Sequence, residues 1–208
     1  VLAIVAIFKC SYMATVQNNV KTVLAYSSVA QIGYMILGVS LVSVTGLMSG
    51  MIHIFNHALM KGALFLSLAA VMYRTGGVQL RHFAGLGEHM PWTMAALVVG
   101  GLSLVGLPLT VGFVSKWYLL LASFETQAWL AIFVILFGSI LAIIYFWRIL
   151  EAAYFKKASI DGQRVKEAPM SLLIPIWLLT LANLYFGIHT DFTLSMSQQA
   201  AVSLIQGN

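Results

Sequence analysis

Residues 51–66 read MIHIFNHALMKGALFL, an apolar run in which His53, His57 and Lys61 recur at intervals of four. On an α-helix this spacing places the three side chains on one face, over about 12 Å of rise. The residues between them suit a bilayer interior, where ionisable groups are costly and usually face a polar interior or mark an ion path. Because two imidazoles and an amine in a column can pass a proton along, the stretch predicts a proton relay on a buried helix face.

The composition assigns the chain to the helical membrane proteins. Of 208 residues, 61% are hydrophobic and 8% are charged, and the mean hydropathy is +0.94. A soluble domain of this size needs far more charge to cover its surface. The net charge of +5 does not indicate nucleic-acid binding, because the basic residues are not gathered into one patch. Cys10 is the single cysteine, which excludes an internal disulfide and a cysteine-based metal cluster.

The apolar segments predict a polytopic all-α bundle with about six transmembrane helices. A bilayer core of about 30 Å takes roughly 20 apolar residues per helix. The six expected spans are residues 1–16, 22–44, 46–73, 91–122, 127–155 and 168–188. Residues 190–208 show a looser helical pattern with polar residues between, which predicts a short interfacial helix. Since Val1 opens directly inside an apolar run, we expect a truncated first span and a longer parent protein.

Charges in the loops predict the orientation of the chain. Lysines and arginines concentrate on the loops of one side, whereas the other side carries only Glu125 and Asp191. The positive-inside rule makes the basic side cytoplasmic, so both the N-terminus and the tail lie outside. We therefore expect a multi-pass protein of the cell's inner (plasma) membrane. The basic residues of the cytoplasmic side are Lys21, Arg74, Arg81, Lys156, Lys157, Arg164 and Lys166, with Arg148 near a span end.

The span at residues 91–122 is too long for one straight helix. A continuous helix there would measure about 48 Å, well beyond a bilayer core of about 30 Å. Its middle contains Gly106, Pro108 and Gly112, and proline removes a backbone donor and clashes with the preceding turn. We therefore expect two half-helices joined by a short non-helical segment. Lys116 follows this break, and broken helices beside ionisable residues recur in transporter sites.

Each candidate residue also has a simpler explanation. His53 and His57 have the spacing of a zinc pair, but no acidic residue or cysteine accompanies them, and a membrane histidine often only bonds a neighbouring helix. Lys116 could reach the interface from a helix end, and Lys9 fits either a further relay position or such a lysine. Ser115 beside Lys116 could form a hydrolase dyad, but no second motif supports one. No phosphate loop, dinucleotide fingerprint or carboxylate pair occurs, so we expect no catalytic site, metal or cofactor in this chain.

Three stretches together carry a family resemblance. LAYSSVAQIGYMILG (residues 24–38), HIFNHALMKGALFL (53–66) and GLPLTVGFVSKWYL (106–119) resemble the antiporter-like membrane subunits of respiratory complex I, membrane-bound hydrogenases and Mrp-type sodium/proton antiporters. LGEHMPWT (86–93) and YFWRILEAAYF (145–155) are similar to connecting segments of the same family. The likeness covers nearly the whole chain.

The resemblance implies a fold of two inverted five-helix repeats, each with a broken helix, of which this chain matches the second repeat and the last helix. Residues 1–155 would form the repeat, 156–189 a cytoplasmic loop and final span, and 190–208 the interfacial tail. His53, His57 and Lys61 match the family's hydrated central relay, and Lys116 matches the basic residue that ends the path toward the outside. The family's buried glutamate and two central lysines belong to the first repeat, so a missing N-terminal repeat or a partner must supply them.

The expected function is proton translocation by a subunit of a larger membrane complex. Expected partners are the lipid bilayer and other membrane subunits of a multisubunit antiporter or respiratory complex; H⁺ is the expected ion and Na⁺ is left open. The motifs favour the Mrp-type antiporter branch or the hydrogenase-associated branch, with a membrane subunit of NADH-quinone oxidoreductase as runner-up. Two alternatives stay open: a membrane scaffold that does not conduct, and a self-contained carrier for a small cation.

Overall fold

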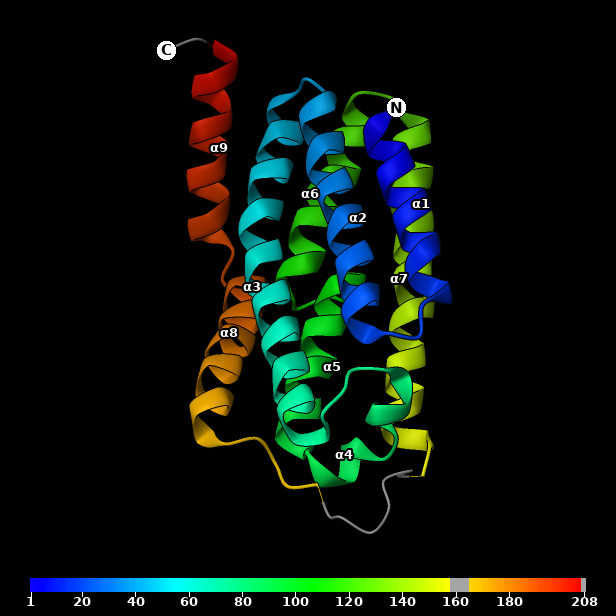
Figure 1. Ribbon diagram of the computed structural model, residues 1–208. Helices are drawn as coiled ribbons and strands as arrows, with labels where there is room; N and C mark the ends of the chain where they lie inside the picture. The colour runs from blue at the N-terminus through cyan, green and yellow to red at the C-terminus, as the bar shows by residue number, and fades with distance from the viewer. Residues whose placement is uncertain (158–164, 207–208) are drawn as a thin grey trace.

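The computed structural model describes residues 1–157 and 165–206, and no β-strand occurs within these ranges. The helices assemble into an upright bundle with both chain ends at its upper end (Figure 1). They are α1 (Leu2–Val16), α2 (Val20–Ser40), α3 (Val44–Thr75), the 3₁₀-helix η1 (Leu80–Phe83), α4 (Leu86–His89), α5 (Pro91–Val105), α6 (Val111–Glu125), α7 (Trp129–Phe155), α8 (Met170–Ile188) and α9 (Asp191–Gln206). The predicted all-α bundle is confirmed.

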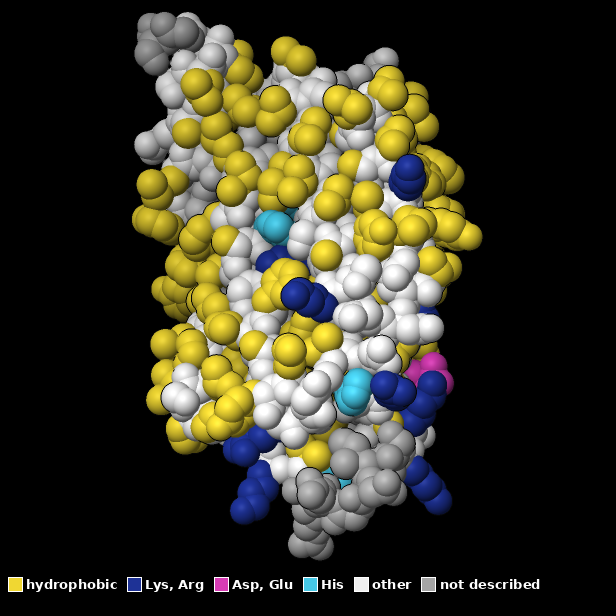
Figure 2. All heavy atoms as spheres, viewed as in Figure 1, with side chains coloured by type: hydrophobic (Ala, Val, Ile, Leu, Met, Phe, Trp, Pro, Cys, Tyr) yellow, Lys and Arg dark blue, Asp and Glu magenta, His cyan; other side chains and the backbone are white. Residues whose placement is uncertain are grey.

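The outer surface of the bundle is apolar, as a membrane protein requires. Of the described helices, α2, α3, α7 and α8 are long and apolar enough to cross a membrane, and α1 and α5 are shorter apolar helices. Hydrophobic side chains cover much of the face seen in Figure 2, whereas several lysines and arginines gather at its lower end. Large side chains such as Leu136, Ile140 and Trp147 on α7 point outward and are about half exposed. A surface of this kind is stable only in contact with lipid or protein partners.

The predicted break in the fourth span is confirmed. Helix α5 ends at Val105 and α6 begins at Val111, and the two half-helices follow one another up the bundle (Figure 1). Gly106 has φ +96°, which a residue with a Cβ rarely adopts, and its N–H and that of Leu107 both donate to the Leu102 carbonyl. The expected segment, residues 106–112, therefore contains the break, although Gly112 itself already belongs to α6.

Two glycines let the break pack tightly against its neighbours. A Cβ on Gly112 would collide with the Ser103 carbonyl oxygen, so the start of α6 crosses directly against the end of α5. A Cβ on Gly187 of α8 would lie 2.5 Å from the Leu109 carbonyl oxygen, so α8 presses its backbone onto the break. The break is thus covered by protein, which is the condition for non-helical backbone at membrane depth.

Side chains tie together the ends of several helices at the lower end of the bundle in Figure 1. The Glu167 carboxylate accepts hydrogen bonds from the Trp92 and Thr93 N–H groups at the start of α5, at 2.8 and 3.4 Å. Arg74 at the end of α3 donates to the Glu167 carbonyl at 2.6 Å. Arg148 on α7 donates to the Gln17 carbonyl at 2.9 Å and so holds the turn between α1 and α2. Arg164, predicted to share this cytoplasmic side, lies outside the described residues.

The tail is helical, as the sequence predicted, and its interfacial placement stays a prediction. Helix α9 stands above α8 and runs along the upper half of α3, parallel to the bundle axis (Figure 1). A helix lying flat in the interface would run across that axis. Ala201 is fully buried and packs with Met48 and Ile52 of α3, which explains why α9 stands upright. The division into a repeat, a final span and a tail stays a prediction.

Candidate functional site

Helix α3 carries the predicted column into the interior of the bundle. His53 and Lys61 are 2% and 5% exposed, and His57 between them is half-buried. The rings of His53 and His57 lie nearly parallel, with centroids 6.5 Å apart. The three residues therefore share one helix face, as their spacing predicted.

Helix α2 supplies a partner for each end of the column. Ser27, Gln31 and Tyr34 are all buried and recur on one face of α2 at spacings of four and three. Ser27 contacts Lys61, Gln31 contacts His53, and Tyr34 packs edge-on against His53 with ring centroids 5.8 Å apart. Two polar stripes, one from α2 and one from α3, thus face each other inside the bundle.

Both ring nitrogens of His53 are engaged. Nε2 lies 3.0 Å from Gln31 Oε1, and Nδ1 lies 2.7 Å from the Ser115 hydroxyl on α6. Because the amide oxygen only accepts, the neutral ring donates from Nε2 and accepts from Ser115 at Nδ1. A second proton on Nδ1 would require the Ser115 hydroxyl to turn, and the Val111 and Gly112 carbonyl oxygens lie 3.5 Å away to receive it. His53 is therefore built to change its proton number with one hydroxyl rotation.

Lys61 is held by the body of α2. Its Nζ donates to the Leu24 carbonyl at 2.9 Å and to the Ser27 hydroxyl. Phe65 lies beneath it, with the ring centroid 5.8 Å from Nζ. Residue 24 is internal to α2, so its carbonyl also accepts the ordinary intrahelical bond.

Lys116 is held by the break. Its Nζ donates to the Leu104 and Val105 carbonyls at 3.0 and 2.9 Å and to the Ser139 hydroxyl on α7 at 3.2 Å. The two carbonyls belong to the last turn of α5, where the break leaves them without intrahelical donors. A cation at a helix C-terminus is further favoured by the helix dipole. Lys116 is 5% exposed, so the lysine expected beside the break lies in the interior.

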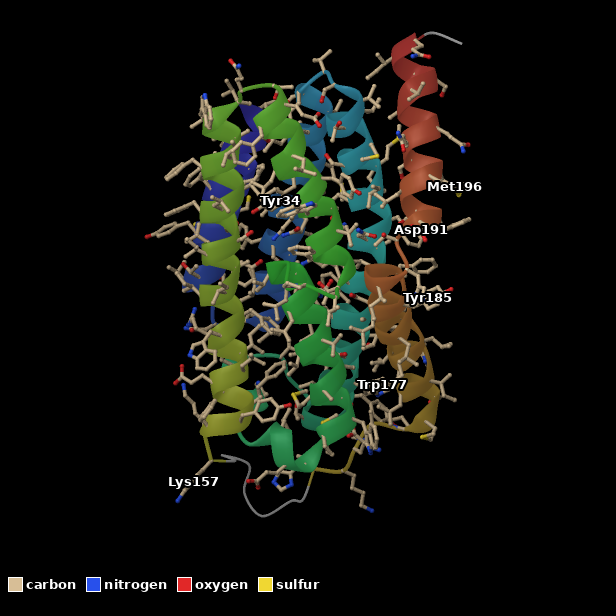
Figure 3. The ribbon with its side chains drawn as sticks, turned by 180° about the vertical axis from the view of Figure 1, so that it is seen from behind. Tyr34, Lys157, Trp177, Tyr185, Asp191 and Met196 are labelled. Atoms are coloured by element: carbon tan, nitrogen blue, oxygen red, sulfur yellow. The ribbon has the colours of Figure 1, made fainter. Side chains whose placement is uncertain are left out.

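Three polar side-chain atoms in this region make no hydrogen bond of normal geometry among the described residues. They are His57 Nε2 and the hydroxyls of Tyr34 and Tyr145, and all three are buried. Tyr34 lies inside the bundle (Figure 3). Its ring is 5.0 Å from Lys116 Nζ and 5.8 Å from the His53 ring, so this residue contacts both. Buried polar groups are usually paired, so the unpaired atoms mark places where a proton carrier or water can attach.

The structure brings four of the five predicted relay residues together and leaves out the fifth. Lys9 is exposed on α1, beside Phe8, Tyr12 and Phe137 at the outer surface. No group of three His, Cys, Asp or Glu side chains suited to a metal occurs within the described ranges. Sequence reasoning missed the partners Ser27, Gln31, Tyr34, Ser115 and Ser139. The one available signal was the pair Ser27 and Gln31, polar and four apart in an apolar span.

This architecture is that of a polytopic membrane protein in which a broken helix closes over a buried lysine, beside a helix that carries a column of two histidines and a second lysine. The comparison with protein families identifies the chain more narrowly. Residues 1–142 match the family described as NADH:quinone oxidoreductase/Mrp antiporter, TM, and the chain belongs to this family.

Individual relatives agree with that assignment. The chain is 38% identical over 204 residues to NADH-quinone oxidoreductase subunit N of Desulforudis audaxviator, covering 92% of this chain and 41% of the relative. Among solved structures, an Mrp complex from Dietzia superposes with a TM-score of 0.90 at 22% identity, over 99% of this chain and 46% of that chain. A chain of the membrane-bound sulfane sulfur reductase, an archaeal respiratory membrane complex, superposes with a TM-score of 0.88 at 30% identity, over 98% and 41%. The chain thus spans less than half the length of each of these relatives.

Proposed function

We propose that this chain is the proton-conducting part of a subunit in a multisubunit membrane complex. The observation that carries the proposal is the pair of buried lysines, Lys61 and Lys116, which have no carboxylate partner in the described part of the chain. A lysine at the membrane centre costs about 2.5–3.5 kcal/mol on insertion scales. Such a cost is difficult to explain in a scaffold, whereas a lysine without a fixed counter-charge can take up and release a proton.

The proposed path runs from Lys61 through His57 and His53 to Lys116, and from there to the outer side. Histidine suits the intermediate steps because its ordinary titration range lies near neutral pH. Residues four apart on a helix are about 6 Å apart along its axis, so water must complete the path between them. We assign Lys116 to the end of the path because its amine is held by the last two carbonyls of α5, directly before the helix break.

The proposed setting is a respiratory or antiporter complex in the cell's inner (plasma) membrane. The names of the relatives described above support such a complex, and their greater length leaves room for the first repeat that this chain does not contain. H⁺ is the proposed ion, and Na⁺ exchange would need a separate demonstration. The basic loops face the cytoplasm in this proposal. A cysteine at position 157, in a background without Cys10, should resist an impermeant reagent added outside, and labelling there would contradict the orientation.

The test is proton movement in vesicles that carry the assembled complex with the full-length subunit. Lys61→Ala and Lys116→Ala should each reduce transport strongly while the complex still assembles. Lys116→Glu should be milder, because a carboxyl group also carries a proton. Lys9→Ala is the matched control, since Lys9 is exposed and lies apart from the column. If both interior alanine variants assemble and pump at the parental rate, the chain acts as a scaffold and the proposal fails.

A further inference from the structure

The path proposed above contains an interruption between His53 and Lys116. The hydrogen bonds of Lys116 Nζ go to α5 and α7, namely to Leu104, Val105 and Ser139. His53 bonds instead to Gln31 on α2 and Ser115 on α6. Within the described residues, therefore, no hydrogen bond joins the two groups or their partners.

The Tyr34 ring contacts the residues on both sides of this interruption. Its edge meets His53 at 68° with centroids 5.8 Å apart, and its face lies 5.0 Å from Lys116 Nζ. The side chain is 1% exposed, and Figure 3 shows it within the bundle. Gly138 on α7 makes room for the phenol, since a Cβ there would collide with the Tyr34 hydroxyl oxygen. One aromatic ring thus contacts both the histidine and the lysine, and Gly138 leaves the space that it fills.

The ring can sense the charge of Lys116. An ammonium over an aromatic face is attracted by the ring quadrupole, and the attraction is larger where water is excluded. Protonated Lys116 therefore holds the ring in place, whereas neutral Lys116 does not. The Tyr34 hydroxyl makes no hydrogen bond of normal geometry among the described residues, but it lies beside the Ser139 hydroxyl, which accepts from Lys116. The polar contact of the phenol therefore leads to Lys116, as its aromatic face does.

We propose that Tyr34 is a valve between His53 and Lys116, a positioning residue whose aromatic face closes the path while Lys116 is protonated and releases it when the lysine is neutral. The inference rests on the proposed proton path and adds a direction to it. A proton that has reached Lys116 closes the way back to His53, so it leaves on the outer side. Besides Lys116 itself, the titratable groups that face this position are Tyr34 on α2, His53 and His57 on α3, and Tyr145 on α7. Helix α5 contributes carbonyl groups, and α8 has no charged residue.

The test is the passive proton leak of the full-length complex in proteoliposomes with an imposed pH gradient. Tyr34→Phe keeps the ring and should leak no more than the parent. Tyr34→Leu removes the aromatic face and should leak about tenfold faster. Because leucine could disturb assembly, a second series replaces Tyr34 by phenylalanine with one, two or three fluorine atoms, which weaken the quadrupole with little change of shape. The leak should rise stepwise along that series, to about tenfold.

Two outcomes separate the valve from the proton path itself. If the leak does not change along the fluorine series, the ring quadrupole has no role and the valve is overturned. If Tyr34→Phe leaks as fast as Tyr34→Leu, the hydroxyl and not the aromatic face controls the leak, and the valve is overturned as well. Lys116→Ala is measured in the same preparation for driven transport. If it pumps at the parental rate, the proposed path fails; if it is inactive while the fluorine series is flat, only the valve fails.

Discussion

The two buried lysines are held in different ways. Lys61 rests on an intact helix, where it shares the Leu24 carbonyl with the hydroxyls of Ser27 and Ser28. Lys116 rests on the end of a broken helix, where two carbonyls have no intrahelical donor and a third acceptor comes from Ser139. The difference teaches that the break supplies solvation for a buried cation, which an unbroken helix provides only poorly.

The largest expected effect comes from adding a side chain where α5 and α6 pack backbone to backbone. Gly112→Ala places a methyl group on the Ser103 carbonyl oxygen, which is backbone and cannot turn away. Overpacking costs about 1–3 kcal/mol and occasionally more, and we expect the upper end or failure to assemble. Gly62→Ala, one residue from Lys61, is the control, because its Cβ meets only the flexible Leu179 side chain, at 2.8 Å. Thermal unfolding of the two variants measures the difference in stability. Equal losses of stability would show that packing at the break is no tighter than packing around Gly62.

The next variant separates backbone strain from support of Lys116. Gly106 and Gly76 both have positive φ, at 96° and 73°, so alanine should cost about 1–3 kcal/mol at either position. A Cβ at Gly106 would also lie 3.0 Å from Lys116 Cδ, whereas a Cβ at Gly76 meets nothing within 4 Å. We expect similar losses of thermal stability in both variants and a loss of proton transport only in Gly106→Ala. Equal transport in the two would mean that Lys116 tolerates a reshaped break.

Removing the serine hydroxyl that accepts a hydrogen bond from each lysine tests the comparison directly. Ser27→Ala leaves Lys61 with one shared carbonyl, and hydrogen bonds to charged groups contribute about 1.5–3 kcal/mol. Ser139→Ala leaves Lys116 with two carbonyls that have no intrahelical donor, so the loss of unfolding free energy should be about 1 kcal/mol or less. Unfolding midpoints of the purified full-length variants report both values. A larger loss for Ser139→Ala would reverse the ranking of the two environments.

The smallest expected effect lies at the opposite end of α5. Glu167→Gln keeps an acceptor for the Trp92 and Thr93 N–H groups but removes the negative charge from the helix N-terminus. A charge of this kind contributes about 0.3–1 kcal/mol at low ionic strength and is screened by salt. Glu151→Gln is the control, because Glu151 forms an exposed pair with Lys156 at 3.5 Å. The difference between the two variants should shrink at high salt; a salt-independent difference would point to geometry instead of charge.

Much of this architecture could be predicted from the sequence because membrane physics leaves strong signals. Apolar length located the spans, the excess length with Gly106 and Pro108 located the break, and a spacing of four aligned the histidine column. The partners on α2, α6 and α7 could not be predicted in the same way. A serine in an apolar helix commonly bonds its own backbone, as Ser67 does with Ala63, so Ser139 carries no mark of a neighbour, and Ser27 is marked only by its spacing of four from Gln31.

Which faces meet is decided by packing and not by local pattern. Tyr34 has the sequence context of an ordinary aromatic packing residue, and only the fold places Gly138, distant in the chain, against its hydroxyl. The upright direction of α9 has the same origin, since Ala201 finds its contacts on α3. Contacts between distant segments depend on the whole bundle, and a single sequence contains no direct record of them.

The backbone contact between Gly187 and the break limits how far this protein could be reduced. Helix α8 has none of the proposed relay residues, yet it lies with its backbone against Leu109 and Thr110. A shortened version that stops after α7 would keep every proposed proton carrier and would expose the non-helical backbone at Leu109 and Thr110 to lipid, which offers no hydrogen bonds. An engineer who wishes to transplant the relay into another membrane protein must therefore move α8 together with the helices before it, because the helices that carry the relay do not cover the break from lipid by themselves.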